Sequence, residues 1–161
     1  MTSCEYSHDV YTAMIDTTTP QQESAADLVE TFEMFDEWED RYRFLIDLGG
    51  KLPPLESSQK TDENRVHGCQ SSVWLVAKPE ESGVEKRIDF LADSDSSIVR
   101  GLIAILQRVY AGQKPADILS FDINALFTRL GLDQHLSIGR RNGLAGMVKR
   151  IRELAAQNGN D

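Results

Sequence analysis

The sequence predicts a single domain of mixed helix and sheet, and three observations support this. A strand-turn-strand pattern occupies residues 72–91. Apolar residues at helical spacing precede and follow it. The chain has 161 residues, of which 40% are hydrophobic and 27% charged, as is typical of one soluble globular domain. No apolar run approaches the roughly 18 residues that a membrane-spanning helix needs.

Residues 1–22 are expected to form an acidic, disordered N-terminal extension, followed by one domain over residues 23–158. Residues 1–40 carry 11 acidic and no basic side chains, so the rest of the chain has a net charge of +2 within a total of -9. This distribution argues against nucleic-acid binding, which needs a basic surface. The acidic front either steers a basic protein partner or is a solvated tail.

Compartment signals point to the cytoplasm. The N-terminus lacks the cationic and apolar regions of a secretory signal, and the first lysine or arginine is Arg41, so a transit peptide is not expected. The two cysteines, Cys4 and Cys69, do not make a disulfide framework. Cys4, within the extension, is interpreted as an incidental exposed thiol.

Two helices are predicted before the hairpin. The first begins at Ser24, with Leu28, Phe32 and Phe35 on one face. Asp36 and Glu39 resemble a capping box that opens the second helix, which ends at Gly49-Gly50. Its inward residues are expected to be Trp38, Tyr42, Leu45, Ile46 and Leu48.

A long surface connection over residues 51–63 leads to the predicted hairpin, because Pro53-Pro54 cannot continue a helix. Strands are expected over residues 72–78 and 84–91, with a turn at residues 79–83. A two-stranded ribbon alone is marginally stable, so a third strand or a helix layer is expected. Part of the segment Glu63–Val66 is the candidate third strand.

Four helices are predicted after the hairpin. Residues 97–111, capped from within Asp93–Ser96 and ended by Gly112, are apolar almost all round and should form the core helix. Short helices follow from Pro115 to Leu119 and from the Asp122 cap to Leu130, where Gly131 ends the second. Ser137 is expected to cap the last helix, whose inner residues are Leu144, Met147, Val148, Ile151 and Leu154.

The last helix carries Arg140 and Arg141 in its first turn, where the helix dipole disfavours cations. Residues that break a local preference without an evident gain often mark functional sites. An arginine beside a helix N-terminus makes an anion site, and the alternative is that both arginines are solvated.

Cys69 is the main candidate for chemistry. It lies at a loop-to-strand junction, between Gly68 and a small polar run, rather than inside an apolar pattern. A cysteine acts as a nucleophile through its thiolate, which needs positive charge or hydrogen-bond donors nearby. Arg65, His67 and Arg140 are candidates for that role. His67 and His135 are candidate general bases for a cysteine hydrolase, although neither has an evident orienting partner.

Other chemistries have less support. The two cysteines and three histidines (His8, His67 and His135) show no zinc-like spacing, and an iron–sulfur site ordinarily needs three or four cysteine ligands. No glycine-rich nucleotide motif is present. A single thiol without further catalytic groups suits sulfur exchange, in which a thiolate takes the outer sulfur of another protein's persulfide.

The segment Val66–Trp74, which contains Cys69, resembles the signature of the SufE family of sulfur acceptors, which includes CsdE-like members. The resemblance covers roughly residues 25–157 in order. Its further motifs are Trp38–Tyr42, Leu48-Gly49, Leu52-Pro53, Asp93–Asp95, Ile98–Ile103, His135–Ser137, Arg140, Gly143-Leu144 and Met147.

The resemblance implies an α+β domain of the SufE/IscU type, with a small antiparallel sheet packed against helices. It implies that Cys69 accepts persulfide sulfur from a SufS- or CsdA-like cysteine desulfurase, stimulates that enzyme and passes sulfur to a SufBCD-type scaffold for iron–sulfur clusters. Pyridoxal phosphate then belongs to the desulfurase, and this chain is expected to need no cofactor or metal and to have no independent turnover. His67, Gly68, Gln70 and Ser71 would shape the loop, and Arg140 would stabilise the sulfur anion.

Two features depart from the family pattern. The acidic residues 1–22 have no counterpart, and Ile138-Gly139 stands where a proline is common, which would loosen the turn around Arg140. An IscU-like cluster scaffold is the alternative function, against which the lack of further cysteines argues.

Overall fold

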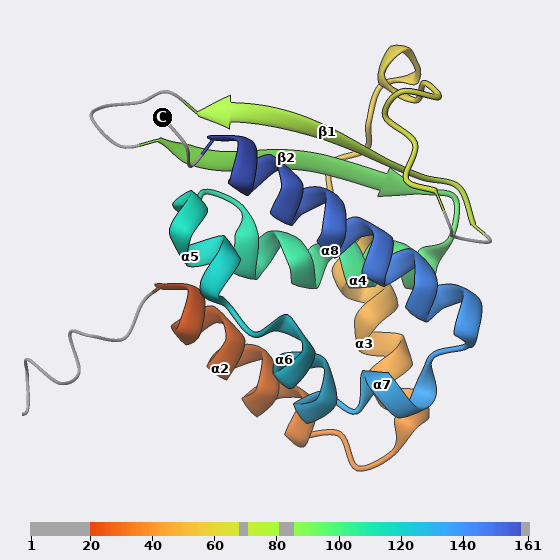
Figure 1. The fold of residues 1–161 in the computed structure, drawn as a ribbon. Coiled ribbons are helices and arrows are strands. Elements are labelled where there is room, and N and C mark those ends of the chain that lie inside the picture. Colours follow the sequence, from red (N-terminus) through yellow and green to blue (C-terminus); the bar gives the residue numbers. More distant parts are fainter. Residues whose placement is uncertain (1–19, 68–70, 81–85, 159–161) are drawn as a thin grey trace, which may run out of the picture.

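The structure is a computed structural model that describes residues 20–67, 71–80 and 86–158 (Figure 1). In these ranges it confirms the predicted α+β class. The elements in chain order are α2 (Pro20–Glu33), α3 (Trp38–Gly50), the 3-10 turn η1 (Ser57–Gln59), β1 (Val73–Glu80), β2 (Arg87–Ser94), α4 (Ser97–Tyr110), α5 (Pro115–Ser120), α6 (Ile123–Arg129), α7 (Leu132–His135) and α8 (Ile138–Asn158).

Strands β1 and β2 form the predicted antiparallel hairpin, in register from Val73 opposite Ser94 to Glu80 opposite Arg87. Both strands end later than predicted: β1 includes Pro79 and Glu80, and β2 continues to Ser94. The predicted start of the second strand at residue 84 lies outside the described residues, and β2 begins at Arg87. An edge strand tolerates a proline because the missing N–H need not face a partner. The remainder of the predicted turn, residues 81–83, lies outside the described residues.

The segment before β1, predicted as a possible third strand, pairs with β1 over a much shorter stretch. Arg65 makes a single antiparallel bridge with Trp74 instead of a full strand. The Val66 N–H donates to the Val73 carbonyl at 2.8 Å, and the Leu75 N–H donates to the Asn64 carbonyl at 2.8 Å. These bonds place the chain that leads to Cys69 beside β1.

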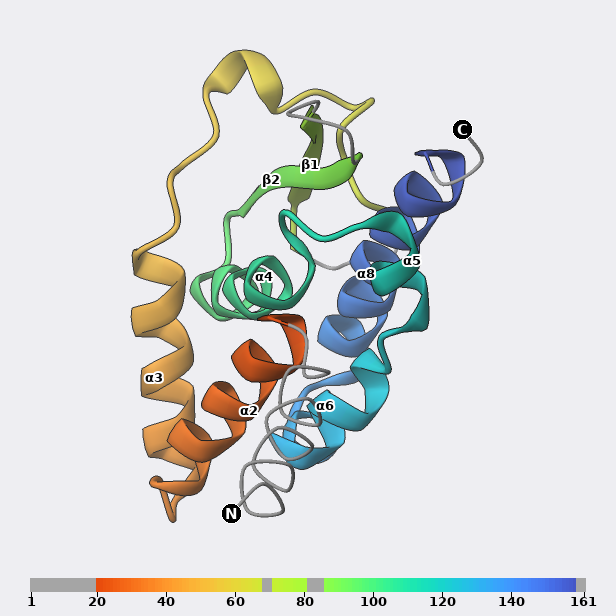
Figure 2. The ribbon, with the colours of Figure 1, turned by 90° about the vertical axis from the view of Figure 1, so that its left-hand side faces the viewer.

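Helix α4 is the core helix, as predicted. It contacts β2, α2, α3 and α8, and Figure 2 shows it in the middle of these elements. Helices α3 and α4 approach closely because both carry a glycine at the crossing. A Cβ atom on Gly49 would lie 2.7 Å from the Gly101 nitrogen, and one on Gly101 would collide with the Leu45 carbonyl. A larger side chain at either position would push the helices apart.

The beginning of the domain differs from the prediction. Helix α2 starts at Pro20, so residues 20–22 belong to the helix and not to the extension. Proline suits a first helical turn, where its missing N–H has no intrahelical partner anyway. Gln21 is only 3% exposed, and its side-chain amide donates to the Val109 carbonyl at 2.7 Å. This tertiary bond anchors the first turn, and no local pattern could have revealed it.

Three further expectations, all in or just before α3, differ from the structure. The N-cap of α3 is Glu37, which makes no side-chain capping bond, so the predicted capping box of Asp36 and Glu39 is wrong. Phe35 was expected on the inner face of the first helix, but α2 ends at Glu33. Phe35 lies after it, with its ring centroid 5.5 Å from that of Phe44. Ile46 is 43% exposed, because α3 turns the face with Leu45 and Leu48 toward the core and consecutive helical residues point in different directions.

The caps of the later helices match the sequence. Ser96, Asp122 and Ser137 accept hydrogen bonds from the backbone of the first turns of α4, α6 and α8. Gly112 and Gly131 have φ values of 74° and 78°, which favour glycine where a helix must end. The short helix α7 was not predicted. None of the helices in the described ranges is long and apolar enough to cross a membrane.

Candidate functional site

Cys69 lies in residues 68–70, outside the described part of the chain, together with the predicted loop residues Gly68 and Gln70. The structure describes the two flanks of this segment, which end at His67 and begin again at Ser71. The candidate site is therefore built from these flanks and from the elements that hold them. Cys4 also lies outside the described residues.

The first flank packs against α8. Val66 is buried and hydrogen-bonded to β1, whereas His67 is exposed. A Cβ atom on Gly146 of α8 would lie 3.1 Å from the His67 carbonyl oxygen and 3.2 Å from Val66 Cγ1. Glycine thus allows the α8 backbone to approach the chain immediately before residues 68–70.

Arg150 lies about one turn further along α8 and was not singled out from the sequence. Its guanidinium donates to the Glu63 carbonyl at 3.0 Å, so α8 holds the same approaching chain at a second point. The spacing of four residues from Gly146 places both positions on one helix face. The sequence shows this spacing, but the spacing indicates a contact only when the chain that leads to Cys69 is known to pack against α8.

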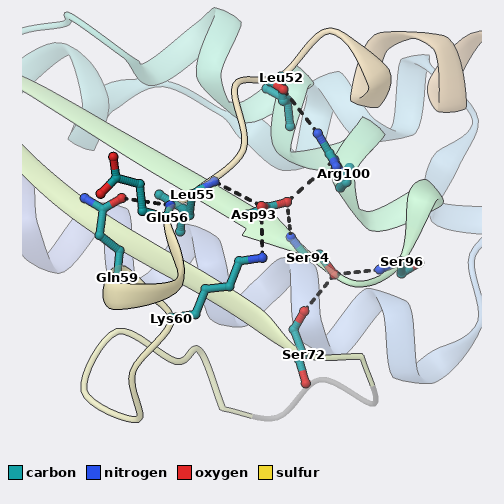
Figure 3. A network of polar contacts seen from close by, with 10 residues as sticks. All are labelled: Leu52, Leu55, Glu56, Gln59, Lys60, Ser72, Asp93, Ser94, Ser96 and Arg100. Carbon is teal, nitrogen blue, oxygen red and sulfur yellow. Dashed lines mark hydrogen bonds and ion pairs between the residues drawn. The ribbon is translucent and has the colours of Figure 1, made fainter.

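The second flank is held by hydrogen bonds at the end of β2. The Ser72 N–H donates to Asp95 Oδ1 at 3.1 Å, and the Asp95 N–H donates to the Ser72 carbonyl at 3.3 Å. The Ser94 hydroxyl donates to the same carbonyl at 2.7 Å and accepts from the Ser96 N–H at 3.1 Å (Figure 3). Ser72 is thereby joined to β2 and to the N-cap of α4.

Asp93 is the buried centre of the adjoining network. It is 3% exposed, and its carboxylate accepts from the backbone N–H groups of Ser94 at 2.8 Å and Leu55 at 3.1 Å. Lys60 and Arg100 each place a nitrogen 3.6 Å from it (Figure 3). Buried carboxylates persist when they are paired and hydrogen-bonded in this way. Asp93 ties the connection after α3 to the hairpin end, beside Ser72.

Two side chains of this network make further contacts. Arg100 also donates to the Leu52 carbonyl at 3.1 Å. The Lys60 ammonium lies 5.3 Å from the centre of the Trp74 ring on β1, within the range of a cation–π interaction. Both contacts join the same connection to the core of the domain.

Arg140 lies in the first turn of α8, where its backbone N–H donates to the Ser137 hydroxyl at 3.3 Å. Its side chain is half-buried and makes no hydrogen bond or ion pair with any residue that the structure describes. Arg141 is exposed and lines a groove on the other side of α8. The proposed contact of Arg140 with Cys69 therefore stays a prediction.

His135, a candidate general base, makes contacts that join two helices. Its ring stacks on Trp38 with centroids 4.0 Å apart and planes inclined by 17°, and its carbonyl accepts from the Tyr42 hydroxyl at 2.7 Å. These contacts join α7 to α3. Among the described residues, no group of three or more histidine, cysteine or acidic side chains could hold a metal ion.

Comparison with known proteins identifies the family. Residues 26–155 match the SufE family model, described as an Fe-S metabolism associated domain. The chain belongs to the SufE family. An uncharacterized SufE-like protein of Rhizobium etli is 44% identical over 128 residues, which are 80% of this chain and 86% of the relative. Another from Rhizobium meliloti is 41% identical, covering 80% of this chain and 91% of the relative.

A solved structure supports the fold. The solution structure of a hypothetical protein from Thermus thermophilus superposes with a TM-score of 0.68 over 86% of this chain and 97% of that protein. The two proteins therefore share a fold, although their sequences are only 18% identical.

Proposed function

We propose that this SufE-family protein accepts sulfur on Cys69 from the persulfide of a cysteine desulfurase, stimulates that enzyme and delivers the sulfur to a SufBCD-type scaffold. The family's association with Fe–S metabolism supports the general role. The observation that carries the proposal is the anchoring of both flanks of residues 68–70. Gly146 of α8 packs against one flank, and Asp95 and Ser94 hold the other.

The chemistry of the proposed step needs only one thiolate. The Cys69 thiolate attacks the outer sulfur of the donor's cysteine persulfide, a new S–S bond forms at Cys69, and the donor's S–S bond breaks. The donor cysteine leaves as a thiolate, so the step requires no outside oxidant or reductant. Pyridoxal phosphate is the cofactor of the desulfurase. This chain serves as sulfur carrier and activator without turnover of its own.

Positive charge and hydrogen-bond donors near the sulfur favour this reaction, since they stabilise a thiolate or persulfide anion. Arg140 belongs to the first turn of α8, whose N-terminus adds the positive end of the helix dipole. Gly146, which touches the flank before Cys69, lies in the same helix. We propose Arg140 as the stabilising cation and His67, Gly68, Gln70 and Ser71 as the residues that shape the loop.

The test is intact-protein mass spectrometry with peptide mapping after incubation with free cysteine and a cysteine desulfurase. A gain of one sulfur that a thiol reductant removes, located on Cys69, is the expected result. The Cys69→Ser variant should not gain sulfur or stimulate the desulfurase, whereas the matched Cys4→Ser variant should behave like the wild type. Sulfur on Cys4, or stoichiometric iron on anaerobically purified protein without sulfur transfer, would contradict the proposal.

A further inference from the structure

A groove of about 850 Å³ runs along α8, on a different side of the helix from the chain that leads to Cys69. Helix α8 forms one wall, and α6, α7 and the residues before α6 form the other. Its apolar lining includes Phe121, Ile123, Phe127, Leu136, Leu144 and Val148. Such a groove between helices is suited to an apolar segment of polypeptide.

The α8 wall of this groove is mainly basic. Arg141, Lys149 and Arg152 line it, with Glu153 as the acidic residue on the same helix. The side chains of Arg141 and Lys149 make no ion pair or hydrogen bond with any residue in the described ranges. The opposite wall carries Asp133 and Asp122, and the Asp122 carboxylate already caps α6. An occupant that lies against α8 is therefore favoured if it is apolar and acidic.

The first described residues of the chain lie close to one end of the groove. Gln21 in the first turn of α2 is bonded to the carbonyl of Val109. The next residue, Tyr110, packs its ring 6.1 Å from that of Phe121, which lines the groove. The Tyr110 hydroxyl also faces Arg152 of the α8 wall; burial raises the pKa of Tyr110, and Arg152 opposes that rise. The N-terminal segment thus joins the domain beside the groove.

The 19 residues that precede α2 have the matching chemistry. They contain Glu5, Asp9 and Asp16 and no lysine or arginine. Their apolar side chains gather in one stretch, at Tyr6, Val10, Tyr11, Met14 and Ile15.

The segment is also long enough. From Arg152 to Arg141 the α8 wall extends about 17 Å, at about 1.5 Å per helical residue. An extended chain advances about 3.3 Å per residue, so fewer than ten residues span that wall.

We propose that residues 5–16 dock in the groove of their own chain, with their apolar side chains against its floor and their carboxylates near Arg141 and Lys149. Ala145 and Lys149 line the groove, while their neighbours Gly146 and Arg150 contact the chain that leads to Cys69. The docked segment therefore covers the α8 surface next to the candidate site. A protein that binds this surface has to displace it.

The native Cys4 provides the test. A nitroxide spin label is attached to Cys4 in the full-length Cys69→Ser variant, and amide signal intensities are measured by NMR before and after reduction of the label. Groove residues such as Phe127 and Ala145 should lose most of their intensity, whereas residues of α3 should keep theirs. The loss should weaken as salt is raised, because exposed charges are screened.

Matched variants separate docking from general effects. Val10→Asp with Met14→Asp in the segment, or Ala145→Glu at an exposed position of the groove, should restore the intensities. Met34→Glu, at a position 79% exposed and outside the groove lining, should leave the losses unchanged.

Three results would overturn the proposal. They are losses absent from the groove, losses insensitive to the groove and segment variants, and losses transferred to unlabelled copies in a mixed isotope-labelled sample. The last result would identify a second copy as the occupant.

Discussion

The two flanks of the Cys69 segment are held by different kinds of interaction. The flank after it is fixed by directional hydrogen bonds from Ser94 and Asp95, supported by the buried Asp93. The flank before it shares backbone hydrogen bonds with β1, but its distance from α8 depends on close packing against Gly146, where a side chain is missing. Hydrogen bonds specify the register of Ser72, while packing sets the distance from α8. The two flanks should therefore respond differently to substitution.

The largest loss of stability is expected from Asp93→Ala, which affects the hydrogen-bonded flank after Cys69. Removing the carboxylate leaves Lys60 and Arg100 partly buried beside an unpaired backbone N–H of Leu55. Loss of one partner of a buried ion pair costs about 3–5 kcal/mol, which should appear in the free energy of unfolding from urea denaturation. Asp47→Ala, at an exposed position of α3, should change little. Equal stability of the two variants would refute a central role for Asp93.

The Gly146→Leu variant tests the packing of α8 against the flank before Cys69. A leucine cannot fit within about 3 Å of the His67 carbonyl without displacing it, and overpacking typically costs about 1–3 kcal/mol. The rate of Cys69 alkylation should change as well, because the displaced flank adjoins Cys69. Gly50→Leu is the control, since a Cβ at Gly50 meets nothing within 4 Å. If alkylation of Gly146→Leu matched the wild type, contact with α8 would not govern the loop.

A smaller effect is expected for Ser94→Ala. The change removes the donor to the Ser72 carbonyl and the acceptor for the Ser96 N–H, with a cost of about 1–2 kcal/mol. Amide hydrogen exchange of Ser96 should accelerate because its N–H loses its acceptor. Exchange of Ser72 should accelerate as well, because the loosened flank weakens the bond from the Ser72 N–H to Asp95. Ser120→Ala removes an exposed hydroxyl bond and should leave both amides protected. Unchanged exchange in Ser94→Ala would show that Asp95 alone holds the flank.

The smallest effect on stability is expected for Arg140→Ala, because its side chain has no bonding partner among the described residues. Sulfur acceptance by Cys69 should instead slow by roughly tenfold, equivalent to about 1.4 kcal/mol in the barrier. Single-turnover transfer from a persulfidated desulfurase measures this rate. Arg129→Ala removes an exposed cation at the end of α6, outside the groove lining, and this control should retain the wild-type rate. An equal slowing in both variants would assign the effect to general surface charge.

Local features of the chain were predictable from the sequence. The alternation in β2, the serine and aspartate caps, and the glycines that end helices depend on residues near one another in the chain. The sequence also identified the segment around Cys69 through its motif. The capping box at Asp36 and the inward position of Ile46 failed, because local signals of similar strength compete and packing on α4 decides between them.

Roles that depend on distant residues were decided by the tertiary structure. In the sequence, Asp93 was a candidate helix cap, and Asp93 and Arg100 both belonged to motifs of the family resemblance. The fold joins them with Lys60 into the support of Ser72. Gly146 similarly gained its meaning from the carbonyl of His67. The sequence by itself determined the family, the hairpin and the helices other than α7, since these follow from short-range patterns and a motif. Only the tertiary structure decided which side chains hold the flanks of Cys69, because burial and hydrogen-bond partners arise when segments far apart in the chain pack together.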